Sequence, residues 1–213
     1  MTIESSTVYL LEVESGYAVE AKLRDAISED QLRDWEDHWQ PALWIALLRL
    51  DAEGVRQVRP QSAHWNWQTK MERIRGLLAH QTFCIVCDGI TQGMMQVDLT
   101  RTSRIESQRA KPLVYVDYLE NAPWNRPELY NPARYRGVGS MLIRAAIELS
   151  LQEEFQGRIG LHSLPQANNF YGRKCGMTDL GPDAAYQGLR YFEMTPKQAR
   201  SFIETGEEKG RST

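Results

Sequence analysis

The chain has 213 residues, 42% of them hydrophobic and 25% charged, which is the composition of an ordinary globular protein. Its 28 acidic and 25 basic residues give a net charge of −3, which does not favour general binding to nucleic acid or to an anionic membrane. No stretch approaches the roughly 18 consecutive apolar residues of a membrane span, and residues 1–7 do not resemble a signal peptide. These features predict a cytoplasmic protein.

Strand character recurs in the first part of the chain. The five stretches that show it are residues 8–11, 17–21, 82–88, 92–100 and 113–120. The first two predict a β-hairpin, or an extension followed by a first strand. The next two predict a hairpin around Asp88-Gly89, because apolar and polar residues alternate after that turn. The last is apolar on both faces, which predicts a central strand.

Helices are predicted between the two hairpins. Ser28 and Gln31 form a capping box, so a helix begins there, and Pro41 ends or interrupts it. Two more helices are expected over residues 43–50 and 65–78, separated by a polar loop. The five tryptophans of this region, at 35, 39, 44, 65 and 67, are explained either by core packing or by an aromatic cleft for a cationic amine.

Cys84 and Cys87 form a Cys-x-x-Cys pair, but they lie within a predicted strand. A strand sends residues three apart to opposite faces, so the two thiols cannot face each other. We therefore predict ordinary buried thiols and no metal site. The charged stretch at residues 102–111 is predicted to be a mobile loop.

The most informative stretch is Arg134-Tyr135-Arg136-Gly137-Val138-Gly139-Ser140, which opens an amphipathic helix over about residues 138–153. Glycines at this point let the backbone bend tightly and approach a ligand. The first N–H groups of a helix are unpaired and lie at its positive end, so the turn predicts a site for an anion, most commonly phosphate. No lysine follows as in a P-loop, and Leu142 replaces the third glycine of a dinucleotide fingerprint.

These residues match Arg/Gln-x-x-Gly-x-Gly/Ala and resemble the pyrophosphate-binding motif of the Gcn5-related N-acetyltransferases (GNAT family). A second block follows about thirty residues later, as in that family: a strand at 158–162, a helix with Ala167-Asn168-Asn169-Phe170-Tyr171, and Gly176-Met177 at its end. The resemblance covers about residues 113–194. It departs from the family at Leu164, where many members have Asn, and between Tyr171 and Gly176, where one residue is added.

The resemblance implies acetyl transfer from acetyl-coenzyme A to an amine in a direct ternary complex, with no metal. It implies that the amides of Arg136, Gly137, Val138, Gly139 and Ser140 bind the pyrophosphate, with the Arg134 and Arg136 side chains near its charge. The strand before the turn is expected to splay from its neighbour. Its backbone at Tyr118, Leu119 and Glu120 would then contact the pantetheine and the acetyl carbonyl.

Two side chains are candidates for proton transfer, and a third for cofactor binding. Glu120 is the first candidate for the base that accepts the amine proton, although a glutamate at a strand end is often simply solvated. Tyr171 occupies the family's tyrosine position and is assigned as the general acid for the leaving thiolate, the alternative being a core tyrosine. Asn168, one helical turn earlier, is expected to bond the pantetheine amides. His162 is assigned a structural role.

Residues 121–132 are longer than the usual family connection and contain three prolines. Trp124 and Asn125 in this insertion are candidates for substrate binding, the alternative being a loop packed by its own tryptophan. After the second block we predict a turn at residues 180–182, a last strand at 189–194 and a helix to about residue 204.

Together these features predict an α/β (α+β) fold: a single GNAT-like domain with a central, mostly antiparallel mixed sheet, flanking helices and splayed central strands. Residues 1–205 would form the domain, with residues 1–80 on the acceptor side, 81–194 as the cofactor-binding core, and 206–213 as a disordered tail. The predicted partner is a small-molecule or peptide amine, and a homodimer stays open. The alternatives are transfer to oxygen or of a longer acyl group, a non-catalytic coenzyme A-binding regulatory module, and an acetyltransferase toxin acting on aminoacyl-tRNA.

Overall fold

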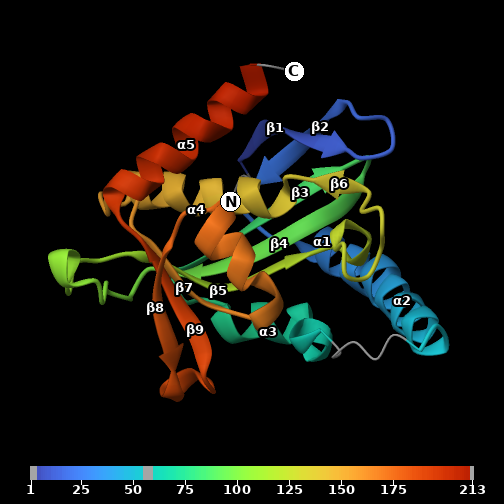
Figure 1. Cartoon of the computed structure of the whole chain (residues 1–213), viewed down its shortest axis with the longest axis horizontal. Helices are drawn as coiled ribbons and strands as arrows, with labels where there is room; N and C mark the ends of the chain where they lie inside the picture. The colour runs from blue at the N-terminus through green and yellow to red at the C-terminus, as the bar shows by residue number, and fades with distance from the viewer. Residues whose placement is uncertain (1–3, 55–59, 212–213) are drawn as a thin grey trace. The chain divides into compact units, whose positions relative to one another are not determined.

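The computed structural model describes residues 4–54 and 60–211 (Figure 1). Nine strands of this described part form one sheet in the order β6-β1-β2-β3-β4-β5-β7-β9-β8. The chain divides into two compact units, Met1–Met95 with Leu119–Leu142, and Gln96–Tyr118 with Ile143–Thr213. The predicted mixed, mostly antiparallel sheet flanked by helices is confirmed.

The first unit begins with a hairpin of β1 (Ser5–Glu12) and β2 (Ala18–Arg24), in antiparallel register. β2 pairs with β3 (His80–Cys87), which turns at Asp88-Gly89 into β4 (Ile90–Asp98). Both predicted hairpins are therefore confirmed. Cys84 and Cys87 are buried free thiols that bond different carbonyls, those of Ala26 and Glu20.

The helices of the first unit begin at the predicted capping box, where the Ser28 N–H donates to Gln31 Oε1 at 3.0 Å. They are α1 (Glu29–Asp34), a π turn (Trp35–Trp39), α2 (Gln40–Ala52) and α3 (Trp67–Ile74). Of the two outcomes predicted at Pro41, an end or an interruption, the structure has the second: the regular α-helix gives way to the π turn and resumes as α2. The π turn precedes Pro41 and widens the helix, so that the proline ring avoids the carbonyl that it would otherwise meet.

The large side chains of the first unit make its core. Fully or almost fully buried are Leu10, Trp35, Trp39, Trp67, Ile85 and Tyr135. The Trp39 indole N–H donates to the Thr91 carbonyl at 2.8 Å, so this tryptophan joins the helices to β4 as well as filling the core. Trp44 is 58% exposed, in contrast, and lies on the outer face of α2.

The second unit is built on β7 (Ile159–Ser163), β8 (Thr178–Asp183) and β9 (Leu189–Met194). β7 pairs with β9 and β9 with β8, both antiparallel. Residues 180–182 were predicted as a turn, but they lie within β8. The register shifts between Asp179 and Pro182 because a proline cannot donate to the ladder and an irregularity accommodates it.

Residues 102–111, predicted as a mobile loop, are tied to β9 by one buried carboxylate. Glu193 accepts hydrogen bonds from the Ser103 hydroxyl and from the Arg104 and Ile105 N–H groups. The side chain of Glu193 is fully buried, so these donors also satisfy a charge that would be costly to leave alone. The loop is therefore part of the second unit's packing.

The last helix, α5, spans Pro196–Arg211. It continues past Gly206, where a disordered tail was predicted, because the Glu, Lys and Arg residues there are also good helix formers. Residues 212–213 of the predicted tail lie outside the described residues. None of the helices in the described part combines the length and the apolar character needed to span a bilayer.

The start of α4 (Val138–Gln152) packs against β4 in the first unit at a position without a side chain. A Cβ added at Gly93 would lie 2.5 Å from Val138 Cγ1 and 3.0 Å from Leu142 Cδ1. Real side chains do not approach so closely, so the glycine sets how near the first turn of α4 can come to the sheet.

We expect Gly93→Ala to lower the free energy of unfolding by about 1–3 kcal/mol, because the overpacked methyl group must displace the first turn of α4. Urea unfolding measures this change. Gly206→Ala is the matched control, since a Cβ added at Gly206 would have nothing within 4 Å and alanine is a better helix former. Equal midpoints for Gly93→Ala and the wild type would contradict the prediction.

Candidate functional site

The predicted phosphate turn follows a short strand, β6 (Tyr135–Arg136), that pairs with the end of β1. The Val13 N–H also donates to the Arg134 carbonyl, at 2.9 Å. Gly137 then has a φ of 103°, a conformation that favours glycine, and α4 begins at the next residue. The sheet edge thus fixes the direction in which the chain enters the helix.

The N–H groups at this turn are open. The first helical bond of α4 is donated by Met141 N–H to the Gly137 carbonyl, at 2.9 Å. Among the described residues, no acceptor is bonded to the N–H groups of positions 137–140. Gly137 has no side chain with which to cap the helix. The Ser140 Oγ is buried and likewise has no partner in the described part of the chain. The turn can therefore present several donors to one anion.

The two arginines of the motif differ in their contacts. Arg134 pairs with Asp88 at 3.2 Å and lies over the ring of Tyr135, whose hydroxyl also donates to Asp88. Arg136 is exposed and forms no ion pair with the residues that the structure describes. Arg136 is therefore the cation that is available to a ligand at the turn, whereas Arg134 helps to fasten the strand that leads into it.

The insertion at residues 121–132 is fastened beside this turn by one glutamine. The Gln92 Oε1 accepts hydrogen bonds from Trp124 Nε1 at 2.8 Å and from Asn125 Nδ2 at 2.9 Å. Asn125 Oδ1 accepts in turn from the Tyr135 N–H, at 2.9 Å. Both ends of the buried Asn125 amide are used inside the protein, so its contact with substrate stays a prediction. Trp124 is half-buried. Because its indole N–H already donates to Gln92, only the face of its ring is left for a contact with substrate.

Glu120 lies at the end of β5 (Val114–Asn121) and is buried. Its carboxylate accepts a hydrogen bond from Trp67 Nε1 at 2.7 Å and lies 3.7 Å from the Arg126 guanidinium. Burial raises the pKa of the Glu120 carboxyl, whereas the Trp67 hydrogen bond and the Arg126 charge lower it. Glu120 is not a solvated strand end, and its role as a base stays a prediction.

Tyr171, in the second unit, lies in a helical turn that begins as a 3₁₀ helix (Pro165–Ala167) and ends as a π turn (Phe170–Lys174). The Cys175 N–H donates to the Phe170 carbonyl, five residues back. This wider turn absorbs the residue added between Tyr171 and Gly176. The predicted helix is thus present, but it is less regular than expected.

The Tyr171 side chain is buried, and its hydroxyl has no hydrogen-bond partner among the described residues. Burial raises the pKa of the phenol well above its usual value, and the nearby Cys175 thiol acts in the same direction. Tyr171 therefore stays protonated over the physiological range. The Oδ1 of Asn168 is also buried without a partner in the described part.

The predicted splay of the central strands has a counterpart in the second unit. β5 pairs with β7 in parallel only from Val114 to Val116, although β7 continues to Ser163. From Asp117 onward the β5 backbone is not paired with β7. Tyr118 and Leu119, the predicted pantetheine contacts, follow this point and are partly exposed.

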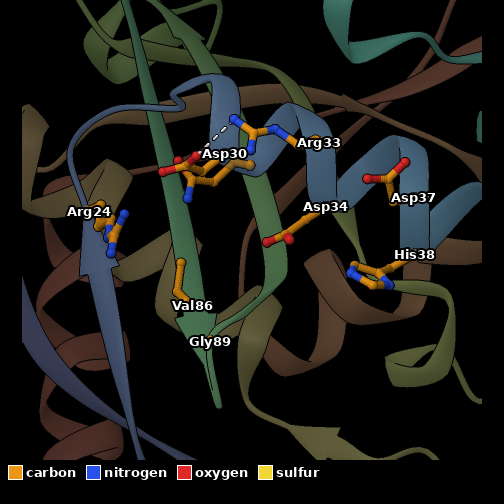
Figure 2. A pocket seen from close by; sticks show the side chains of 9 residues that line it. Arg24, Asp30, Arg33, Asp34, Asp37, His38, Val86 and Gly89 are labelled. Atoms are coloured by element: carbon orange, nitrogen blue, oxygen red, sulfur yellow. Dashed lines mark hydrogen bonds and ion pairs between the residues drawn. The ribbon is translucent and has the colours of Figure 1, made fainter.

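Two further features of the described residues are a pocket and a cluster of side chains that includes two aspartates. A pocket of about 380 Å³ in the first unit is lined by charged side chains of both signs, Arg24, Asp30, Arg33, Asp34 and Asp37, and by His38. Figure 2 shows these side chains. None of the predicted site residues lines this pocket.

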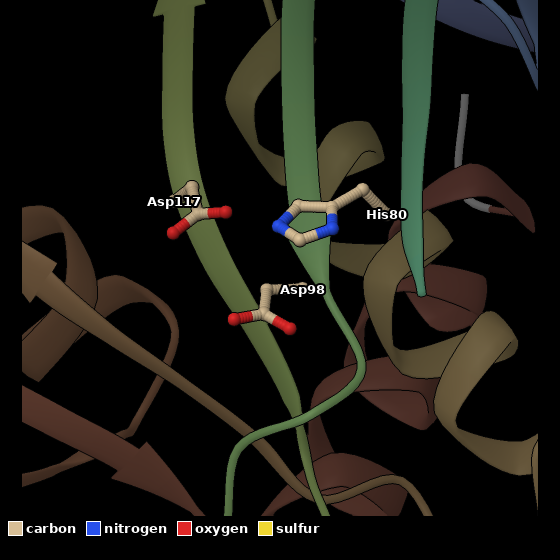
Figure 3. Close-up of side chains that lie close together, drawn as sticks. All are labelled: His80, Asp98 and Asp117. Carbon is tan, nitrogen blue, oxygen red and sulfur yellow. The ribbon is translucent and has the colours of Figure 1, made fainter. Parts of the chain in front are cut away.

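Figure 3 draws Asp98 at the end of β4 and Asp117 in β5. Asp98 holds its own turn, accepting from Thr100 and pairing with Arg101 at 3.0 Å.

Sequence reasoning missed Gln92 and Gly93, which fasten the insertion and the first turn of α4 to β4. It also missed Trp67 and Arg126 as the partners of Glu120. A glutamine in a predicted strand carries no local pattern, and its partners lie 32 and 33 residues away. The adjacent Gly93 offered one clue, because a glycine within a strand often marks a close approach of another segment.

No protein-family model matches the chain, and the search of curated proteins gave no match. Among solved structures, the GNAT domain of S. lividans PAT is 13% identical, with a TM-score of 0.51, and the match covers 89% of this chain and 96% of that one. Mycobacterium smegmatis RimJ, solved with CoA-disulfide, is 14% identical with a TM-score of 0.49, covering 97% and 98%. The PaiA N-acetyltransferase of Thermoplasma acidophilum, solved with coenzyme A, is 11% identical with a TM-score of 0.49, covering 82% and 98%.

At 13% identity, the similarity to the GNAT domain of S. lividans PAT concerns the fold alone. It agrees with the mostly antiparallel sheet flanked by helices that is described above. The chain has the GNAT fold.

Proposed function

We propose that this protein is an N-acetyltransferase that uses acetyl-coenzyme A and transfers the acetyl group directly to a primary amine of a small molecule or peptide. The observation that carries the proposal is the glycine turn at the start of α4, whose N–H groups at positions 137–140 have no acceptor among the described residues. The GNAT fold supports the same assignment. Acetyl-coenzyme A would supply the activated acetyl group and a diphosphate for this turn.

In this proposal the diphosphate is held by the amides of residues 136–140 and by the Arg136 side chain. The unpartnered Ser140 Oγ supports a ligand at this place, since buried polar atoms are seldom left without a hydrogen bond. Asn168 is assigned to the pantetheine for the same reason. Its carbonyl oxygen is an acceptor without a donor in the described part, and a pantetheine amide offers an N–H.

Tyr171 is assigned as the acid that protonates the leaving thiolate. A phenol whose pKa is raised by burial keeps its proton at neutral pH, and a hydroxyl without an internal partner is free to donate it. Glu120, in contrast, already receives the Trp67 indole N–H and faces Arg126. We assign Glu120 the task of holding these two side chains at the end of β5.

Calorimetric titration with coenzyme A and a thiol-release screen with acetyl-coenzyme A test the proposal. The screen would cover simple amines, amino acids, aminoglycosides and peptides. Binding with turnover on at least one amine is the expected result. A protein that binds coenzyme A and never releases thiol would be a binding module, and the absence of any heat of binding would refute the proposal.

Gly137→Ala is expected to weaken coenzyme A binding about tenfold. Alanine is strained at a φ of 103°, and a turn that relaxes redirects the amides away from the diphosphate. Calorimetry gives the dissociation constant. Gly76→Ala is the matched control, because Gly76 also has a positive φ, 81°, and has open space around it. Equal losses of affinity in the two variants would show only a general effect of strain.

Tyr171→Phe is expected to lower kcat about 100-fold while coenzyme A affinity stays within about twofold, because only the transferable proton is removed. Thiol release and calorimetry measure the two quantities. Tyr130→Phe is the control: it removes a hydroxyl that donates to the Ala42 carbonyl and plays no part in the proposed chemistry. A Tyr171→Phe enzyme with wild-type kcat would exclude the acid role.

Glu120→Ala is expected to lower the free energy of unfolding by about 2–4 kcal/mol, because it leaves the buried Trp67 donor without an acceptor and removes the more buried of the two carboxylates that face Arg126. Glu128→Ala is the matched control. Glu128 pairs with the same arginine at 2.9 Å, but it is 36% exposed and should contribute less than about 1 kcal/mol.

Glu120→Gln keeps an acceptor for Trp67 and cannot take up a proton. We expect its kcat to stay within about threefold of the wild type, measured by thiol release on correctly folded enzyme. A kcat loss above about 100-fold with unchanged coenzyme A affinity would instead make Glu120 the base.

A further inference from the structure

His162, on β7 in the second unit, joins two other polar groups in a chain. Its Nδ1 lies 2.6 Å from the Tyr115 hydroxyl, and its Nε2 lies 3.0 Å from Asp183 Oδ2. The imidazole side chain is only 4% exposed. The Tyr186 ring stacks on it at 3.6 Å, and the Tyr191 ring lies 4.6 Å away, so the imidazole is held in one orientation.

The charges around His162 determine which of its two ring nitrogens carries the hydrogen. Burial lowers the pKa of the imidazole, Asp183 opposes this, and the guanidinium groups of Arg104 and Arg101 add to the lowering. Arg104 and His162 lower the pKa of Asp183 to about 2, so that its carboxylate is ionised and can only accept. Nε2 of the neutral ring therefore carries the hydrogen, and Nδ1 accepts from the Tyr115 hydroxyl.

This arrangement has the order of a catalytic triad, with the Tyr115 phenol in place of a nucleophile. A carboxylate orients the imidazole and fixes its tautomer, and the other ring nitrogen is ready to receive a proton. A purely structural histidine needs only partners for its two nitrogens. Here the partner at Nδ1 is a hydroxyl that can itself exchange a proton.

Acceptor oxygens gather on the same face of the sheet. Asp117, drawn in Figure 3, is two residues from Tyr115 on β5, and residues two apart in a strand point to one face of the sheet. Gln96 on β4 donates from Nε2 to Asp117 Oδ2 at 3.4 Å. The other amide atom, Gln96 Oε1, has no partner in the described part of the chain, although Gln96 is only 4% exposed. A buried carbonyl oxygen without a donor, next to a carboxylate, fits an ammonium group.

We propose that this face of β4, β5 and β7 is the acceptor subsite, where Gln96 and Asp117 bind the substrate's ammonium group and Tyr115, His162 and Asp183 remove its proton. The inference rests on the proposed N-acetyltransferase function. One N–H bond of the ammonium breaks and its proton passes to the Tyr115 oxygen, while the Tyr115 proton passes to His162 Nδ1. The amine is left neutral with its lone pair free, and Asp183 stabilises the imidazolium until the proton returns to solvent.

The test compares pH–rate profiles of the wild type, Tyr115→Phe and His162→Gln, using the amine that turns over fastest in the screen. In the wild type, kcat falls as pH drops through the lowered pKa of His162, because the neutral imidazole is the active form. In both variants kcat should be about 100-fold lower, and the fall in kcat at low pH, the acid limb of the profile, should disappear. The affinity for coenzyme A should be unchanged. Gln96→Met should raise KM for the amine about tenfold and leave kcat within about threefold.

Tyr191→Phe is the control, since it removes a hydroxyl of the same aromatic cluster that is not bonded to His162. It should lower the melting temperature without changing the pH profile. The inference would be overturned if Tyr115→Phe or His162→Gln kept the wild-type kcat and the acid limb. It would also be overturned if these variants only lost stability, by as much as Tyr191→Phe. If the wild type releases thiol and the Tyr115→Phe and His162→Gln variants do so equally well, this inference is refuted and the proposed N-acetyltransferase function stands. A wild type without coenzyme A binding refutes the proposed function itself.

Discussion

The candidate site depends on how closely the first turn of α4 lies against β4, and that distance is set by the missing side chain at Gly93. With Val138 Cγ1 placed 2.5 Å from where a Cβ would be, the turn and the strand are in direct contact. The adjacent Gln92 holds the insertion through Trp124 and Asn125, and Asn125 holds β6 through the Tyr135 N–H. Two consecutive residues of β4 thus fix both sides of the glycine turn, and its open amides are oriented before any ligand arrives.

Most of the fold followed from local patterns in the sequence. The alternation after Asp88-Gly89, the capping box at Ser28 and the apolar stripe of α4 each depend on residues close in sequence, and each is present as predicted. The errors share a different cause. The turn predicted at 180–182 lies within β8, and the loop at 102–111 is ordered by Glu193, about 90 residues away; at Pro41 the sequence did not show that the interruption would be a π turn. Neither the width of a helical turn nor a distant buried carboxylate leaves a periodic pattern.

The candidate site also has parts that depend on residues close in sequence and parts that depend on distant residues. The turn at Gly137 was predictable because glycine spacing and a following helix are local features. The surroundings of Glu120 were not, because Trp67 is 53 residues away and the Arg126 contact depends on how the insertion folds back. His162 reads in the sequence as one residue of a buried strand. Its partners Tyr115 and Asp183 are 47 and 21 residues distant, and only the folded sheet brings them together.

Burial shifts the pKa values of Tyr171, the proposed acid, and of His162, the final proton acceptor, in opposite directions. It raises the pKa of the Tyr171 phenol and lowers that of the His162 imidazole, because in each case it disfavours the charged form. The phenol is therefore kept as a proton donor and the imidazole as a proton acceptor at one and the same pH. A direct transfer from thioester to amine needs both at once, since the amine must lose a proton and the thiolate must gain one. In this scheme burial is the largest cause of both shifts, and at His162 the Arg104 and Arg101 guanidinium groups add to the lowering while Asp183 opposes it.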